Sequence, residues 1–152
     1  MSEGAIEILL VEDNASDVEL VLHSLKKNNF ANRIRVARDG AEALDIMFGS
    51  NGDIFPADSP KLILLDLKLP KVDGLQVLSR LKTDPRTRSI PIVVLTSSRE
   101  DRDLHSCYKL GANSYIVKPV DFTRFAEAVR QLGLYWLLLN EKPAVWHEQQ
   151  EP

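Results

Sequence analysis

Short hydrophobic runs alternate with amphipathic segments along the whole chain. Four runs contain few polar residues and have the length of strands: 6–11, 61–66, 90–95 and 114–117. A further short strand is predicted at 33–37. Near-continuous Val, Ile and Leu runs of this length are typical of strands that are buried on both faces of a parallel sheet. The pattern therefore predicts a central sheet covered by helices on both sides.

The segments between the runs carry apolar residues at helical spacing. Helices are predicted at residues 15–27, with Asn14 or Ser16 as the cap, and at 39–47, 74–82, 99–110 and 122–132. The fourth helix has a thin apolar face and is expected to pack weakly. In the fifth helix, Phe122, Phe125, Ala126, Val129 and Leu132 are expected to face the sheet, and the pattern extends toward Leu139. This alternation of strands and helices predicts an α/β fold.

Two segments fall outside this rhythm. Residues 49–60 are rich in Gly, Pro, Asn, Asp and Ser, which indicates a loop longer than such connections usually are. The loop is either a recognition element or a surface insertion, and the second is favoured because loops accept insertions at little entropic cost. One domain is expected over residues 1–140, with a flexible tail at 141–152.

Composition excludes several classes of protein. The chain has 152 residues and a net charge of −3, so it offers no broad basic field for nucleic acid. Its one cysteine, Cys107, cannot form an internal disulfide and is expected to be a packing residue. The apolar stretch 134–139 is too short to cross a membrane. Together these features predict a cytoplasmic protein that binds neither nucleic acid nor membrane.

Chemically active side chains follow four of the predicted strands. Glu12 and Asp13 come directly after the first run, Asp66 ends the third, Thr96 follows the fourth and Lys118 follows the fifth. Because the carboxyl ends of parallel strands meet at one edge of a sheet, these side chains are expected to converge there.

The carboxylates suit a hard divalent cation. Mg²⁺ keeps several waters and takes one or two direct carboxylates, so Asp13 and Asp66 are candidate direct ligands. Glu12 is expected to act through a bound water, and the backbone carbonyl of Lys68 can complete the shell. Clustered carboxylates repel one another, and the cation together with Lys118 would relieve that repulsion.

A carboxylate beside Mg²⁺ can also attack phosphorus and form an acyl phosphate. Phosphoryl transfer requires mainly positioning and neutralisation of the phosphoryl oxygens. The cation, the Lys118 ammonium and the Thr96 hydroxyl can each take one oxygen, with Asp66 as the nucleophile.

These segments resemble the receiver domain of two-component response regulators. The resemblance rests on the segments Leu10–Asn14, Leu65–Pro70 with Asp73 and Gly74, Leu95–Ser97, and Lys118–Pro119, which occur in the order of the family and span about residues 5–133. It implies a flavodoxin-like, doubly wound, five-stranded parallel sheet of order 2-1-3-4-5 with five helices. It also implies that a histidine kinase phosphorylates Asp66, that the peptide bond before Pro119 is cis, and that Thr96 and Tyr115 form a conformational switch.

A narrower resemblance is carried by Asn113–Tyr115, by Leu134–Leu137 with Asn140 and Glu141, and by the long loop before Lys61. These features are similar to stand-alone regulators paired with phytochrome-type histidine kinases. In this family, the residue two positions after the acceptor affects how fast the acyl phosphate hydrolyses, and in this chain that residue is Lys68. A cation there could shield the phosphoryl group from water or hinder a phosphatase, and both possibilities stay open.

Two other classes of protein use a similar arrangement of strand-end residues or the same fold. A hydrolase of the haloacid-dehalogenase type uses a strand-end aspartate, Mg²⁺ and a lysine, but it needs a second carboxylate where this chain has Lys68. A flavodoxin-like electron carrier needs a phosphate loop after the first strand, where Glu12 and Asp13 would repel a flavin phosphate. Both classes are disfavoured, and the chain is expected to act as a phosphoacceptor rather than as an enzyme.

The carboxyl-terminal apolar stretch suggests an interface. Tyr135, Trp136 and the leucines up to Leu139 exceed what a five-stranded core needs. We expect a homodimer through the fourth helix, the last strand, the fifth helix and this extension. The alternative, an extended helix that folds back on its own domain, stays open.

Overall fold

The computed structural model describes residues 7–27, 33–49 and 59–134. Its centre is a parallel sheet of order β2-β1-β3-β4-β5, formed by β1 (Ile8–Val11), β2 (Ile34–Ala37), β3 (Leu62–Leu65), β4 (Ile92–Thr96) and β5 (Ser114–Val117). The predicted fold class is therefore confirmed, including the strand order. Because every strand is parallel, all five carboxyl ends lie at one edge.

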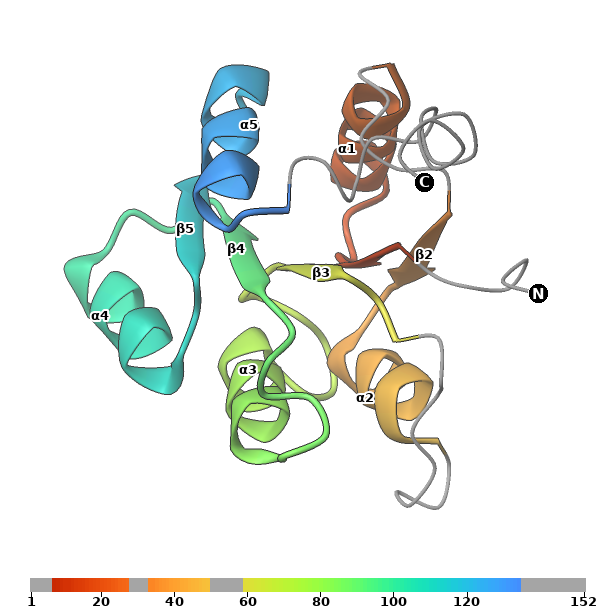
Figure 1. Ribbon diagram of the computed structural model, residues 1–152, viewed down its shortest axis with the longest axis vertical. Helices are drawn as coiled ribbons and strands as arrows, with labels where there is room; N and C mark the ends of the chain where they lie inside the picture. Colours follow the sequence, from red (N-terminus) through yellow and green to blue (C-terminus); the bar gives the residue numbers. More distant parts are fainter. Residues whose placement is uncertain (1–6, 28–32, 50–58, 135–152) are drawn as a thin grey trace, which may run out of the picture.

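The described residues form five helices that cover both faces of the sheet. They are α1 (Ala15–Lys27), α2 (Gly40–Phe48), α3 (Gly74–Thr83), α4 (Asp101–Leu110) and α5 (Phe122–Gln131). Figure 1 shows α1 and α5 on one face, and α2, α3 and α4 on the other. No helix among the described residues is long and apolar enough to cross a membrane.

The sheet separates two hydrophobic cores. Side chains of β3 alternate between them: Ile63 and Leu65 pack with the core on the side of α2 and α3, whereas Leu62 and Leu64 pack with the core under α1 and α5. All residues of β1, β3 and β4 are buried. Burial on both faces explains why these strands have continuous hydrophobic runs and not an alternation of polar and apolar residues.

Polar caps fix the points where the chain turns from strand edge into helix. Asn14, and not Ser16, caps α1, because its Oδ1 accepts a hydrogen bond from the Asp17 N–H at 2.9 Å. Asp73 and Gln76 form a reciprocal capping box at the start of α3. These caps hold the segments that follow β1 and β3 in place, and those segments carry the candidate site.

Three details differ from the sequence expectations. The fourth helix begins at Asp101 and not at Arg99. The fifth helix ends at Gln131, and Gly133 adopts a φ of 74°, a left-handed conformation that stops a helix. Phe122 lines a small cavity with Leu64 and Leu95 of the sheet, as expected, but it is 41% exposed because it stands in the first turn of α5.

The remaining expectations concern α4 and the segments outside the described residues. Cys107 is the buried residue of α4, so the prediction of a thinly packed fourth helix with a packing cysteine is confirmed. Most of the 49–60 loop, the extension toward Leu139 and the tail at 141–152 lie outside the described residues.

Candidate functional site

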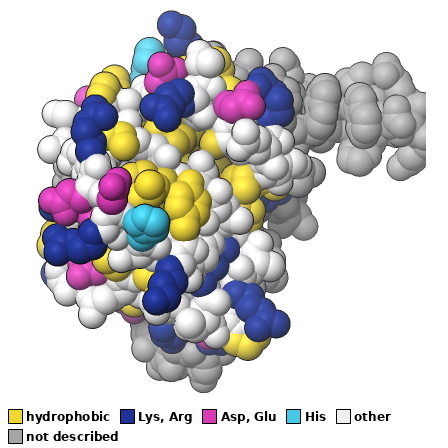
Figure 2. All heavy atoms as spheres, turned by 90° about the vertical axis from the view of Figure 1, so that its left-hand side faces the viewer, with side chains coloured by type: hydrophobic (Ala, Val, Ile, Leu, Met, Phe, Trp, Pro, Cys, Tyr) yellow, Lys and Arg dark blue, Asp and Glu magenta, His cyan; other side chains and the backbone are white. Residues whose placement is uncertain are grey.

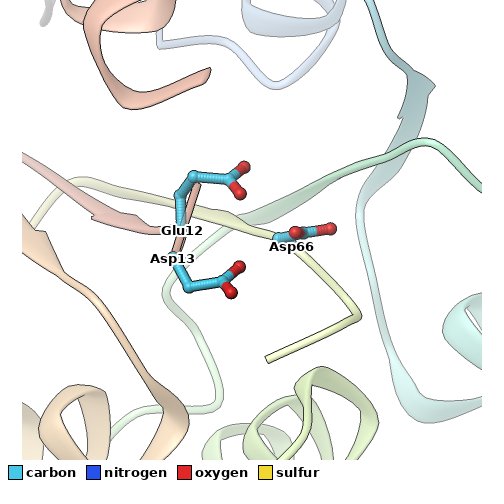
Figure 3. Close-up of side chains that lie close together, drawn as sticks. All are labelled: Glu12, Asp13 and Asp66. Atoms are coloured by element: carbon cyan, nitrogen blue, oxygen red, sulfur yellow. The ribbon is translucent and has the colours of Figure 1, made fainter. Parts of the chain in front are cut away.

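Three carboxylates meet at the carboxyl edge of the sheet. Glu12 and Asp13 follow β1, Asp66 follows β3, and one oxygen of each lies within 4.8 Å of the others. Figure 3 shows the three side chains directed toward the same space. The Asp66 N–H donates to the carbonyl of Val11 at 3.0 Å, so the pairing of β3 with β1 itself places Asp66 beside the other two acids. Glu12 and Asp66 are buried and Asp13 is exposed.

Lys118 brings an ammonium group into this cluster from the end of β5. Its Nζ lies 2.6 Å from Glu12 Oε1, 2.8 Å from Asp17 Oδ2 and 3.5 Å from Asp66 Oδ2. The Lys118 N–H donates to the Thr96 carbonyl at 2.8 Å, which anchors the lysine backbone to β4. The following peptide bond, to Pro119, is cis, as the family resemblance implied.

Burial and charge shift two of these groups. Burial raises the pKa of Glu12 to about 7, and the negative charge of Asp66 adds to this, although the hydrogen bond from Lys118 acts in the opposite direction. Burial alone would lower the pKa of Lys118, but its hydrogen bonds to Asp17 and Glu12 outweigh that effect and raise it. Lys118 therefore stays charged at neutral pH, and burial makes Glu12 easier to protonate than an exposed glutamate.

Thr96 and Tyr115 are both hydrogen-bonded to the backbone of Ser98. The buried Thr96 Oγ1 accepts a hydrogen bond from the Ser98 N–H at 3.3 Å, and the Tyr115 hydroxyl donates to the Ser98 carbonyl at 3.1 Å. Ser98 in turn donates through its own hydroxyl to Asp103 of α4 at 2.5 Å. Ser98 thus connects the strand-end threonine, the tyrosine of β5 and the fourth helix.

The loop after Asp66 is held close to α3 by a glycine. A Cβ on Gly74 would lie 2.3 Å from the Asp66 carbonyl oxygen, so a larger residue cannot occupy this position without moving the acceptor segment. The Gly74 N–H also donates to the Leu67 carbonyl at 2.8 Å. Lys68 is exposed and lines an open cleft of about 500 Å³ together with Asp13 and Arg102.

The structure thus brings Glu12, Asp13, Asp66 and Lys118 together at one site, and it places Thr96 at the neighbouring strand end, hydrogen-bonded to the Lys118 backbone. Sequence reasoning missed Asp17 and Ser98. Asp17 lies in the first turn of α1. Acids are common in the first turn of a helix because the positive end of the helix dipole stabilises them, so the residue did not stand out in the sequence. Ser98 contacts Thr96 and Tyr115 through its backbone, and backbone contacts leave no signature in a sequence.

A protein-family comparison matches residues 8–130 to the response regulator receiver domain. The chain belongs to this family. A curated relative, the probable methanogenesis regulatory protein FilR2 of Methanothrix harundinacea, is 42% identical over 142 residues, which is 93% of this chain and 90% of that protein.

Solved structures of receivers are also similar. The bacteriophytochrome response regulator AtBRR is 51% identical with a TM-score of 0.77, and the alignment covers 90% of this chain and 99% of that one. The Mn(2+)-bound form of the response regulator Rcp1 is 35% identical, with a TM-score of 0.70 and coverage of 90% and 96%. The phosphorylated cyanobacterial phytochrome response regulator RcpA is 35% identical, with a TM-score of 0.71 and coverage of 92% and 99%. This receiver is therefore a homologue of phytochrome response regulators.

Proposed function

We propose that this receiver takes up a phosphoryl group on Asp66 from a histidine kinase, specifically one of the phytochrome type. The observation that carries the proposal is the position of Asp66: a buried carboxylate at a strand end, beside two further acids and 3.5 Å from an ammonium group. In the reaction, an Asp66 oxygen bonds to phosphorus while the bond from phosphorus to the kinase histidine nitrogen breaks. The electron pair of that bond stays on the imidazole.

The chain itself supplies positioning and charge for this transfer. The Leu67 N–H donates to Asp66 Oδ1 at 2.8 Å and so fixes the rotation of the carboxylate. Lys118 stands on the side of Oδ2, where its ammonium can neutralise a phosphoryl oxygen. Thr96 is the last residue of the neighbouring strand β4, and its hydroxyl is proposed to bind another phosphoryl oxygen.

We propose that Mg²⁺ binds at the same edge. The donor set fits, because three carboxylates lie within 4.8 Å of one another and oxygen is the ligand that this ion prefers. Asp13 and Asp66 are proposed as direct ligands, with the Lys68 carbonyl, whereas Glu12 contacts Lys118 at 2.6 Å and is proposed to act through water. When bound, the ion would neutralise acidic charge at the site. The relative Rcp1 has been crystallised with Mn(2+).

The response to phosphorylation is proposed to pass through Thr96 and Tyr115. Both residues are hydrogen-bonded to Ser98, one to its N–H and the other to its carbonyl. A Thr96 hydroxyl that turned toward the phosphoryl group would give up the Ser98 N–H, and the loop that holds the Tyr115 hydroxyl would be free to rearrange. The signal would then change the face formed by α4, β5 and α5.

The face formed by α4, β5 and α5 is the proposed interface of a homodimer. We propose that the protein is not an enzyme and only loses its own phosphoryl group slowly. Figure 2 views the side of the molecule on which α4, β5 and α5 lie, and it shows hydrophobic side chains near the centre with charged residues around them. Tyr108 of α4 is 49% exposed. The buried thiol of Cys107 agrees with action in the reducing cytoplasm.

The experiment compares wild type with Asp66→Asn after incubation with acetyl phosphate and Mg²⁺, using intact-protein mass spectrometry. We expect one phosphoryl group on the wild type and none on the variant, because the amide is nearly isosteric but cannot form the acyl phosphate. Asp45→Asn, an exposed position on α2, is the matched control and should behave as wild type. Phosphorylation of Asp66→Asn at the wild-type level would reject the assignment, and sustained consumption of acetyl phosphate would favour a hydrolase.

A further inference from the structure

Asp17 is the acidic partner of Lys118 that lies outside the proposed metal site. Its Oδ2 is 2.8 Å from the Lys118 Nζ, closer than the 3.5 Å that separates the same ammonium from Asp66. The three carboxylates that group closely enough to share an ion are Glu12, Asp13 and Asp66, so Asp17 is not one of them. It therefore contacts Lys118 without being part of the cluster that could share an ion.

The position of Asp17 is fixed by the start of α1. Asn14 Oδ1 accepts the Asp17 N–H at 2.9 Å, so the same residue has its backbone in the helix cap and its carboxylate on the lysine. Its side chain is 35% exposed, whereas that of Lys118 is 13% exposed. Asp17 thus offers Lys118 a preformed anionic partner at the entrance of the site.

An ammonium group has three protons and must divide them among its acceptors. In this structure Lys118 contacts Glu12, Asp17 and Asp66, and the contact to Asp66 is the longest. A phosphoryl group on Asp66 would need the same ammonium. Binding to Asp17 and binding to the phosphoryl oxygen therefore draw on one cation.

We propose that Asp17 is a positioning residue that competes with the phosphorylated acceptor for Lys118 and so slows phosphoryl uptake. The inference rests on the proposed phosphorylation of Asp66 and adds a residue that sets its rate. Asp17 touches neither the acceptor carboxylate nor the proposed metal ligands in the described contacts, so it acts through the lysine.

The test is a double-mutant cycle with acetyl phosphate and Mg²⁺, in which the rate of phosphorylation is followed by intact-protein mass spectrometry. Asp17→Asn keeps the shape of the side chain and removes its charge. We expect its rate to rise roughly twofold to fivefold, the range of a partly exposed charge pair. In a Lys118→Ala background, the same substitution should change nothing further, because the group through which Asp17 acts is absent. Long incubations keep slow variants measurable.

Two controls separate competition from other effects. Glu19→Gln removes a charge from an exposed position of the same helix and should leave the rate unchanged. Asp17→Glu restores the charge and should return the rate toward wild type. Melting temperatures of all variants show that they are folded.

The outcomes are distinct. An unchanged or slower rate for Asp17→Asn would overturn the inference, and so would an equal acceleration in the Lys118→Ala background, which would indicate a general field effect. If the wild type takes up no phosphoryl group, the proposed function fails and this inference fails with it. If the wild type is phosphorylated and Asp17→Asn has no effect, the inference alone fails.

Discussion

Single residues at the sheet edge carry an unfavourable concentration of negative charge. Glu12, Asp13 and Asp66 lie within 4.8 Å of one another, and Lys118 contacts only the first and third of them. The raised pKa of Glu12, caused first by its burial, reflects this arrangement. The ionised form of Glu12 is therefore disfavoured at the site, whereas the same group of acids favours the charged form of Lys118.

Removal of a single proposed ligand should be visible in metal binding. We predict that Asp13→Ala weakens Mg²⁺ binding at least about tenfold, because Mg²⁺ relies on few direct carboxylates. Isothermal titration calorimetry measures the affinity, with Asp45→Ala as an exposed acidic control far from the cluster in sequence. An unchanged affinity would remove Asp13 from the ligand set.

Cys107 should react slowly with thiol reagents in the folded protein. Burial, with a smaller contribution from Asp103, raises the pKa of Cys107 from 9.0 to about 11. Because the folded-state pKa lies above the unfolded one, the stabilising contribution is complete below about pH 9 and is lost as the pH rises through about 11.

We therefore predict that iodoacetamide modifies native Cys107 slowly at pH 8 and quickly after unfolding. Between pH 9 and pH 11 the free energy of unfolding should fall more steeply for wild type than for Cys107→Ala. Equal slopes for the two proteins, or rapid modification of the native thiol, would contradict this.

At the scale of elements, the end of α3 is joined to two loops by one lysine. Lys82 Nζ donates to the carbonyls of Arg88 and Ile90 at 3.0 and 2.9 Å, and to Asn113 Oδ1 at 3.2 Å. The same Asn113 oxygen accepts the N–H of Ile92, the first residue of β4, at 2.8 Å. Lys82 therefore links α3, the segment before β4 and the turn before β5.

This link should be measurable as stability. Lys82→Met keeps most of the aliphatic stem but removes the Lys82 donor from the carbonyls of Arg88 and Ile90, whereas Asn113 Oδ1 keeps the Ile92 N–H. We predict a loss of about 1–2 kcal/mol in the free energy of unfolding. Lys109→Met, on the exposed side of α4, is the matched control and should stay near wild type. Urea denaturation followed by circular dichroism measures both, and a Lys82→Met variant as stable as wild type would show that solvent replaces the lysine.

Elements were easier to predict from the sequence than the contacts of particular side chains. The strands β1, β3 and β4 are buried on both faces, so their apolar runs and the convergence of Asp66 with Glu12 follow from the sequence pattern. The exposure of Phe122 was not predicted, because helical periodicity fixes a face but not the depth at which a first-turn residue lies. Asp17 was missed because its contact joins the first turn of α1 to the residue after β5, two elements far apart in the sequence.

At the scale of the whole molecule, the sheet presents an uneven surface. One edge strand, β2, pairs with β1, and the other, β5, pairs with β4, where α4 packs with the single buried residue Cys107. A groove of about 320 Å³ runs between β5 and α5, lined by Tyr115, Ile116 and Arg124 among others. This side is the one to which the proposed switch leads.

We predict that the protein forms a homodimer through this side, more strongly when beryllofluoride and Mg²⁺ mimic phosphorylation. Charges introduced by Trp136→Glu with Leu138→Glu, in the apolar stretch that follows the described residues, should shift it to monomer. Light scattering over a concentration series measures the mass. Leu20→Glu, at an exposed position of α1, is the control and should dimerise as wild type does. A wild type that stays monomeric at high micromolar concentration with the mimic bound would rule the dimer out.

The hydrogen bond between Lys118 and Asp17 joins residues 101 positions apart, and the contact between Lys118 and Asp66 spans 52 positions. Contacts of such long range form late, after the chain has closed large loops. During synthesis the acids of β1 and β3 leave the ribosome well before the lysine does. A nascent chain that has not yet added β5 thus holds its acidic residues without their cation. If Asp66 is the phosphoacceptor, as proposed, the complete site should form only when the final strand joins the sheet.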